Sequence, residues 1–214
     1  MKALPPLYLA SASPQRRDIL GELGLDFTVV PTSATEECFP GDPAAIVLNN
    51  ARRKALGARS RLSGDGIVIA ADTLMVAADG SILGKPETPE RAAEYLRRIS
   101  GTRVRVCTGI AAWNLAAARG AEAAAWSAAK LRRLSPAAIE WYVATGEPLT
   151  RAGAFGFSRR GEIFVERLEG EYSCFAGLPK RSLCAVLAAV LPNHPALPPA
   201  DGGIAVGEFT ASGE

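Results

Sequence analysis

Apolar positions along the chain fall into two patterns, and each pattern predicts a different kind of element. Continuous apolar runs at 7–10 and 67–71 are typical of strands that are buried on both faces of a sheet. Shorter β-favouring runs bounded by turn residues, and partial alternation after Arg103, predict further strands. The predicted strands cover 7–10, 27–30, 67–71, 81–83, 103–113 and 161–168.

Helices are predicted where a capping residue precedes proline and apolar residues then recur at helical spacing. Ser13-Pro14, Thr88-Pro89 and Ser135-Pro136 each place an N-cap hydroxyl before a proline at the first helical position. The Ala-rich stretch 114–130 has helical propensity, but alanine is abundant throughout the chain, so propensity alone does not assign its structure. The alternation of strands and helices predicts an α/β fold with a mixed central sheet flanked by helices. The predicted helices cover 14–23, 43–59, 89–99, 136–144 and 183–191.

Length and composition indicate one globular domain. The 214 residues are 48% hydrophobic, which is enough for a sizeable core and excludes wholesale disorder. We expect a single domain over residues 1–191 and a flexible tail, rich in proline and glycine, over 192–214. The apolar runs are too short to span a bilayer and the N-terminus lacks the apolar region of a signal peptide, so a cytoplasmic protein without membrane contact is expected.

Charge and reactive side chains narrow the classes of function. The 24 basic and 22 acidic residues give a net charge of +2, which argues against the broad basic surface of a nonspecific nucleic-acid binder. The four cysteines form no C-x-x-C pair, so free thiols in a reducing compartment are expected. The one histidine, His194, lies in the tail. Acid–base or metal chemistry would therefore fall to carboxylates and lysines.

The turn from strand to helix at residues 11–17 is the first candidate site. A helix N-terminus attracts anions, and Arg16 and Arg17 in the first turn would add guanidinium groups that suit phosphate oxygens. Cationic side chains at this end oppose the helix dipole, and a bound anion would give them a reason to be there. The alternative is an ordinary capped surface helix with solvated arginines.

Isolated acids and lysines are the other candidates. Asp72 follows the apolar run 67–71, and open α/β sheets place their ligands at the carboxyl ends of such strands. A carboxylate there could hold Mg²⁺ or accept a proton from water, and the alternative is a turn cap. Lys85, between a glycine and a proline, and Lys54, on a predicted helix face, could neutralise phosphate or be ordinary surface lysines. By itself, Glu36 is typical of a solvated acid in a loop.

Several short motifs are more specific in their order than any one of them alone. They are Leu9-Ala10-Ser11-Ala12-Ser13-Pro14-x-Arg16, Glu36, Ala51-x-x-Lys54-Ala55, Ala71-Asp72-Thr73, Gly84-Lys85-Pro86, Thr145-x-Glu147-Pro148, Ala152-Gly153-Ala154-Phe155-Gly156 and Gly177-Leu178-Pro179. In this order they resemble the Maf family of nucleoside triphosphate pyrophosphatases, first known as septum-formation inhibitors. The resemblance covers roughly residues 7–191.

The resemblance implies a cytoplasmic enzyme that depends on Mg²⁺ or Mn²⁺. Such an enzyme hydrolyses a nucleoside triphosphate between its α- and β-phosphates and releases the monophosphate and pyrophosphate. The resemblance also implies a Maf/ITPase-like α/β fold with two lobes around a long cleft, often assembled as a homodimer.

The resemblance also implies roles for individual residues. Asp72 matches the family's proton acceptor, and Glu36 matches the loop acid near the metal, so these two are the expected metal ligands. Lys54 and Lys85 match the lysines of the cleft. Ser13 and Arg16 match the phosphate-binding loop, in which Arg17 is the neighbouring cation.

Three positions bear on the choice of base. Relatives that prefer dTTP and UTP usually carry arginine after the first motif's proline, threonine after the aspartate and glutamine in the late glycine loop. This chain has Gln15, Thr73 and Ser158 there, so Thr73 alone favours dTTP and UTP, with modified nucleotides as the alternative. The departures at Gln15 and Ser158, and Thr35 in place of the acid that often precedes the loop glutamate, also leave open a second function, a non-catalytic nucleotide-sensing regulator of cell division.

Overall fold

Two compact units make up the chain, each built from separated stretches of sequence. The computed structural model describes residues 4–37, 41–157, 160–197 and 203–211. Unit 1 comprises Met1–Asp72, Thr108–Ala125 and Gly177–Glu214, and unit 2 comprises Thr73–Cys107 and Trp126–Ala176. Three of the four passages from one unit to the other lie within the three longest strands, and the fourth follows α5 (Tyr172–Phe175).

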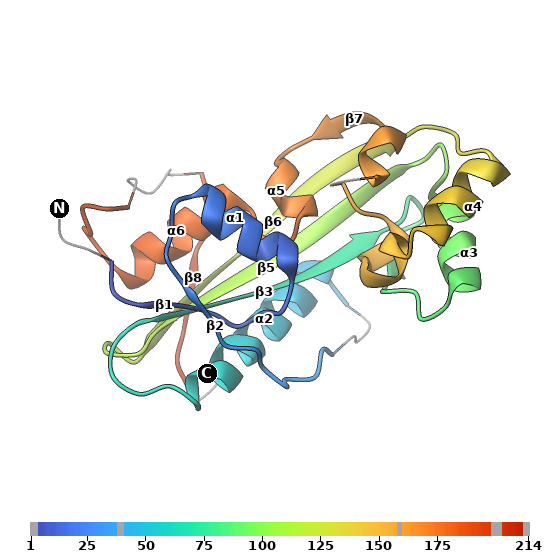
Figure 1. Cartoon of the computed structure of the whole chain (residues 1–214). Coiled ribbons are helices and arrows are strands. Elements are labelled where there is room, and N and C mark those ends of the chain that lie inside the picture. The colour runs from blue at the N-terminus through green and yellow to red at the C-terminus, as the bar shows by residue number, and fades with distance from the viewer. Residues whose placement is uncertain (1–3, 38–40, 158–159, 198–202, 212–214) are drawn as a thin grey trace. The chain divides into compact units, whose positions relative to one another are not determined.

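The strands form one mixed sheet (Figure 1). They are β1 (Leu7–Leu9), β2 (Thr28–Val29), β3 (Ile67–Val76), β4 (Ile82–Leu83), β5 (Arg103–Asn114), β6 (Arg119–Leu131), β7 (Val165–Glu169) and β8 (Gly207–Phe209). Their order is β2-β1-β3-β5-β6-β7, with β4 paired to β3 and β8 paired to β6. β1 is parallel to β2 and β3, whereas β4 pairs antiparallel with β3, and β7 and β8 pair antiparallel with β6. The predicted α/β class with a mixed sheet is confirmed.

The helices are α1 (Pro14–Glu22), α2 (Pro43–Arg59), α3 (Pro89–Ile99), α4 (Pro136–Ala144), α5 (Tyr172–Phe175) and α6 (Lys180–Val190), with short 3₁₀ helices at Glu147–Thr150, Ala152–Ala154 and Gly161–Phe164. Helices α1, α3 and α4 begin at the prolines that follow the predicted caps. The helix predicted from residue 183 begins three residues earlier, and α5 was not predicted. The side chains of Asp42, Thr88 and Ser135 each accept a hydrogen bond from a first-turn backbone N–H at 3.2 Å. Ser13 is the exception, because its hydroxyl donates to Gln15 Oε1 at 3.0 Å and caps no backbone N–H.

The structure corrects two strand predictions. Strand β3 extends beyond the predicted 67–71 to Val76, because its far end pairs with β4, so Asp72 lies inside the strand and not at its end. Residues 161–164 form a 3₁₀ helix, and the strand predicted at 161–168 begins only at Val165.

The Ala-rich stretch that propensity left unassigned is a strand. It is β6, whose alanines at 121, 123, 128 and 129 are buried. Pairing with β7 and β8 therefore overrides the helical propensity of alanine.

Part of the segment expected to be a flexible tail is also a strand. Gly207–Phe209 forms β8 along β6, and the side chain of Phe209 is only 3% exposed. Backbone pairing with β6 and burial of the Phe209 side chain hold this part of the segment on the sheet. Composition alone misses it, because the surrounding residues are rich in glycine and proline.

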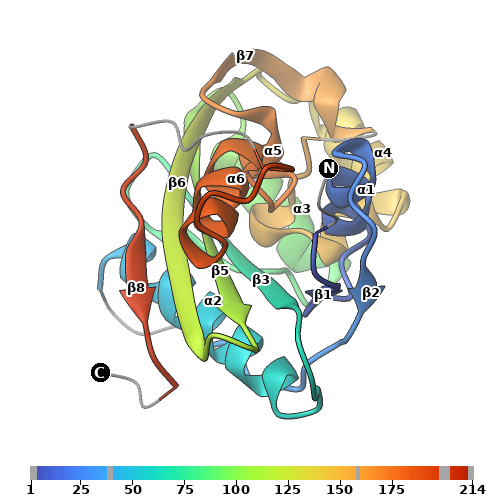
Figure 2. The same ribbon diagram turned by 90° about the vertical axis from the view of Figure 1, so that its left-hand side faces the viewer.

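Unit 1 is layered, with α2 on one face of its part of the sheet and α1 and α6 on the other (Figures 1 and 2). The layer beneath α2 is built mainly from small side chains. They are Ala51, Ala55 and Ala58 of the helix, packed with Ala10, Val68, Ala70, Ala111, Trp113 and Phe209. At Gly109 of β5 a Cβ atom would lie 2.6 Å from the backbone carbonyl of Val47, so helix and strand touch backbone to backbone.

Unit 2 contains α3 and α4, which pack against each other and against the 3₁₀ segments that precede Phe155. Gly153 has a left-handed φ of 64°, and its N–H donates to the carbonyl of Gly84 at 2.9 Å. A Cβ atom at Gly153 would lie 2.2 Å from the Met75 sulfur, so this position requires glycine on both counts.

The predictions of free thiols and of no membrane-spanning helix can be compared with the described residues. Cys107, Cys174 and Cys184 form no disulfide bond there, and Cys38 lies outside the described residues. No helix in the described ranges is both long and apolar enough to cross a membrane.

The close approach of α2 to β5 predicts a steep penalty for one methyl group. Gly109→Ala should lower the free energy of unfolding by about 1–3 kcal/mol, because the new Cβ overlaps the backbone at Val47. Gly21→Ala in α1 is the matched control: nothing lies within 4 Å of its Cβ position, so a gain of up to about 1 kcal/mol is expected. Urea unfolding measures both, and an unchanged stability for Gly109→Ala would contradict the packing described.

Candidate active site

The polar centre of unit 1 is the ammonium group of Lys54. Its Nζ donates to Asp72 Oδ1 at 2.7 Å and to Glu36 Oε1 at 2.8 Å. The Lys54 and Asp72 side chains are 9% and 6% exposed, while that of Glu36 is 51% exposed. The centre is therefore a buried ion pair, Lys54 with Asp72, to which the partly exposed Glu36 adds a second carboxylate.

Three separate elements supply these groups. Lys54 lies on α2, Asp72 on the central strand β3, and Glu36 in the loop that follows β2. On α2, Asn50 precedes Lys54 by four residues, so the two side chains share one helix face. That face is turned toward Asp72, since both side chains reach its carboxylate.

Asn50 connects the three elements. It is 2% exposed, and its Nδ2 donates both to Asp72 Oδ2 and to the carbonyl of Glu37, each at 2.9 Å. Its Oδ1 accepts the N–H of Glu37, also at 2.9 Å. Both backbone groups of Glu37 are thus held by one side chain, which fixes the loop that carries Glu36. The sequence analysis assigned Asn50 no role; the signal that could have found it is an amide four residues before Lys54, on the same helix face.

Arg16 belongs to the same charge cluster. Its Nε donates to the carbonyl of Gly177 at 2.8 Å and its Nη1 to Ser11 Oγ at 3.1 Å. Burial lowers the pKa of the Arg16 guanidinium, and the carboxylates of Asp72 and Glu36 partly offset this by raising it. The guanidinium remains charged, because arginine does not lose its proton in proteins.

The remaining predicted residues occupy other positions. At the start of α1, the Ser13 hydroxyl donates to Gln15 Oε1, and the side chain of Arg17 is exposed. Thr73 and Lys85 belong to unit 2, where Thr73 is half-buried on β3 and Lys85 is exposed after β4. Ser158 lies outside the described residues. Four predicted residues therefore meet in unit 1: Arg16, Glu36, Lys54 and Asp72.

Metal-binding capacity in this cluster rests on two carboxylates. Within the described ranges, no group of three or more His, Cys, Asp or Glu side chains is arranged to hold a metal ion. Asp72 and Glu36 nevertheless converge on one cation, the Lys54 ammonium, through hard oxygen atoms. That donor chemistry suits Mg²⁺ or Mn²⁺, which bind proteins through few carboxylates and complete their coordination with water and phosphate.

A family model described as "Maf-like protein" matches residues 6–190. The chain belongs to the Maf family. This confirms the resemblance that the motif order indicated.

Two relatives of the chain have the same name, dTTP/UTP pyrophosphatase. A dTTP/UTP pyrophosphatase of Anaeromyxobacter dehalogenans is 43% identical over 186 residues, covering 86% of this chain and 93% of the relative. A dTTP/UTP pyrophosphatase of Moorella thermoacetica is 45% identical over 176 residues, covering 81% and 89%. Among solved structures, a HAM1 protein from Coxiella burnetii aligns with a TM-score of 0.48 at 16% identity, covering 89% of this chain and 100% of that chain.

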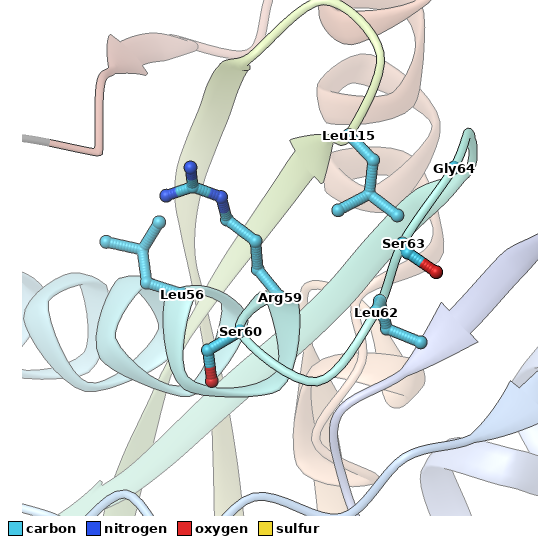
Figure 3. A pocket seen from close by; sticks show the side chains of 7 residues that line it. All are labelled: Leu56, Arg59, Ser60, Leu62, Ser63, Gly64 and Leu115. Atoms are coloured by element: carbon cyan, nitrogen blue, oxygen red, sulfur yellow. The ribbon is translucent and has the colours of Figure 1, made fainter.

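A hollow of about 440 Å³ lies elsewhere in unit 1 (Figure 3). It lies beside the C-terminal end of α2 and is lined by Leu56, Arg59, Ser60, Leu62, Ser63, Gly64 and Leu115. None of its lining residues belongs to the charge cluster of Arg16, Glu36, Lys54 and Asp72. The hollow is therefore not part of the candidate site.

The buried pair predicts an asymmetry between two lysines. Lys54→Met should cost about 3 kcal/mol of stability at neutral pH, because it leaves the buried Asp72 carboxylate without its cation. Lys180→Met is the matched control, since Lys180 forms an exposed pair with Glu22 at 2.8 Å and its loss should cost less than about 1 kcal/mol. Adding Asp72→Asn to Lys54→Met should restore part of the loss. Thermal unfolding would refute the arrangement if the two lysine variants were equally stable.

Proposed function

We propose that this protein is a nucleoside triphosphate pyrophosphatase that cleaves between the α- and β-phosphates and releases a nucleoside monophosphate and pyrophosphate. The observation that carries the proposal is the meeting of Asp72, Lys54, Glu36 and Arg16 in one centre. The curated relatives named dTTP/UTP pyrophosphatase, each matched over most of its length, support it. The alternative of a non-catalytic sensor is not favoured, because these relatives are named as enzymes.

The centre offers cations to a polyphosphate. Arg16 and Lys54 are held in place by neighbouring oxygens, so they present fixed positive charge. Charge that builds on the phosphoryl oxygens and on the departing pyrophosphate would be stabilised by such preorganised groups. In the proposal Lys85 of unit 2 supplies a further cation, and Ser13 and Arg17 contribute to phosphate binding at the start of α1.

Asp72 is the proposed acceptor of the proton from the attacking water. Its two oxygens accept one bond each, from Lys54 and from Asn50. An ionised carboxylate has about four acceptor sites, so each oxygen keeps capacity for a further partner. The lysine and the amide fix the orientation of the carboxylate, and no histidine is needed for this role.

A divalent ion, Mg²⁺ or Mn²⁺, would be held by Asp72 and Glu36. The fit rests on the convergence of both carboxylates on one positive charge. When bound, such an ion neutralises phosphate charge and polarises the phosphoryl oxygens.

The proposed substrates are dTTP and UTP. The names of the relatives and Thr73 support this choice, while Gln15 departs from the usual arginine. A cytoplasmic location and a homodimeric assembly are part of the same proposal, and they rest on the family resemblance.

The central test is pyrophosphate release by the purified protein with dTTP, UTP and the other nucleoside triphosphates in the presence of Mg²⁺ or Mn²⁺. Asp72→Asn should lower kcat by about 10²–10⁴-fold, because the proton acceptor is lost. Asp79→Asn is the matched control: Asp79 is an exposed acid bonded to Ser81 and Arg98, and its loss should leave kcat within twofold. Release of pyrophosphate at the Asp72→Asn rate by the unaltered protein, with every nucleotide, would overturn the proposal.

Lys85 separates a role in catalysis from a role in folding. Because its side chain is exposed, Lys85→Ala should leave the melting temperature within about 1 °C. If Lys85 stabilises the transition state, kcat should fall by about 10²-fold or more. Kinetics and thermal unfolding of one preparation measure both quantities, and an early melt with normal turnover would assign Lys85 to structure instead.

A further inference from the structure

A strand from outside the family match forms part of unit 1. The family model ends at residue 190, whereas β8 covers Gly207–Phe209. β8 pairs antiparallel with β6, with Phe209 opposite Gly120 and Gly207 opposite Glu122 (Figure 2). The segment therefore adds a short strand to the sheet, along residues 120–122 of β6.

The Phe209 ring lies in the layer beneath α2. It is 3% exposed, and it packs with the helix alanines and with Trp113, whose ring centroid is 5.7 Å away. A Cβ atom at Gly120 would lie 2.4 Å from the Phe209 ring, so the absent side chain at that position makes room for the ring. The C-terminal segment thus completes the core between α2 and the sheet.

Charged side chains of α2 rest on the same aromatic pair. The Arg52 guanidinium lies 5.3 Å from the Phe209 ring centroid, and that of Arg59 lies 4.7 Å from the Trp113 ring. Arg52 also donates to both carboxylate oxygens of Glu122 on β6, at 3.0 and 2.5 Å. Phe209 is therefore in contact with the helix from its alanine face and from its arginine flank.

The opposite flank of α2 carries the polar centre. Arg52 and Arg59 are seven residues apart and share one flank, whereas Asn50 and Lys54 lie about half a turn around the helix from them. The ring of Phe209 thus supports α2 on the side away from Asp72. Side-to-side movement of the helix would carry Asn50 and Lys54 with it.

We infer that Phe209 is a positioning residue: docking of β8 holds α2 in the place from which Lys54 and Asn50 reach Asp72. The kinetic part of this inference rests on the proposed function, and the structural part does not. A displacement of a reacting group by about 1 Å can cost about 10²-fold in rate, so loss of the ring should be visible in turnover.

The experiment compares Phe209→Ala with Leu96→Ala in the full chain, at a temperature where both are folded. Leu96 is fully buried in α3 of unit 2, so its truncation also removes a large apolar side chain but leaves α2 untouched. Amide hydrogen exchange in Ala51–Arg59 should become at least tenfold faster in Phe209→Ala and stay within twofold in Leu96→Ala. The kcat/KM for the nucleotide should fall at least tenfold in Phe209→Ala only.

Two further variants keep the test decisive if Phe209→Ala does not fold. Phe209→Leu retains apolar bulk and should return both readouts to within threefold of the unaltered protein. Gly120→Val pushes on the ring from the sheet and should reproduce the faster exchange in α2.

Equal exchange and equal kcat/KM in Phe209→Ala and Leu96→Ala would overturn the inference, as would unaltered exchange in Gly120→Val. If the unaltered protein lacks turnover, the proposed function fails, and the exchange data alone decide whether β8 positions α2.

Discussion

One ammonium group, Lys54 Nζ, holds the polar centre of unit 1 together. It bonds two carboxylates that come from different parts of the chain, one on a buried strand and one on a loop. Lys54 and Asp72 are buried, and buried charges are stable only when their partners are close and well oriented. The position of α2, which carries Lys54, therefore determines whether the centre exists at all.

Small side chains set that position. The face of α2 toward the sheet is lined with alanine, and the strand beneath it has glycine where the helix backbone comes closest. A helix with larger residues on this face would stand further from β3, and a lysine side chain would reach Asp72 less directly. The alanines of α2 therefore determine how close Lys54 lies to Asp72, in addition to favouring a helix.

Local signals in the sequence predicted most element starts, because capping residues and proline act within a few residues. The family resemblance placed Arg16, Lys54, Asp72 and Lys85 in one site together with Glu36; Arg16, Glu36, Lys54 and Asp72 lie together in unit 1, whereas Lys85 belongs to unit 2. Pairing between strands that are distant in sequence could not be predicted from local signals. Such pairing extends β3 past Asp72 and makes strands of β6 and β8. The role of Asn50 also depends on its contact with a distant loop and strand, so spacing on the helix could indicate its face but not its partners.

The separated segments of unit 1 have a consequence for biosynthesis. On the ribosome α2 emerges long before Phe209, and until β8 appears the underside of α2 lacks the Phe209 ring and the edge of β6 at residues 120–122 stays open. Unit 2 takes its last segment from residues that end at Ala176, so it can finish earlier. Closure of unit 1 is therefore expected only after residues 207–209 have been translated, and a nascent protein stalled before β8 would expose apolar surface to chaperones.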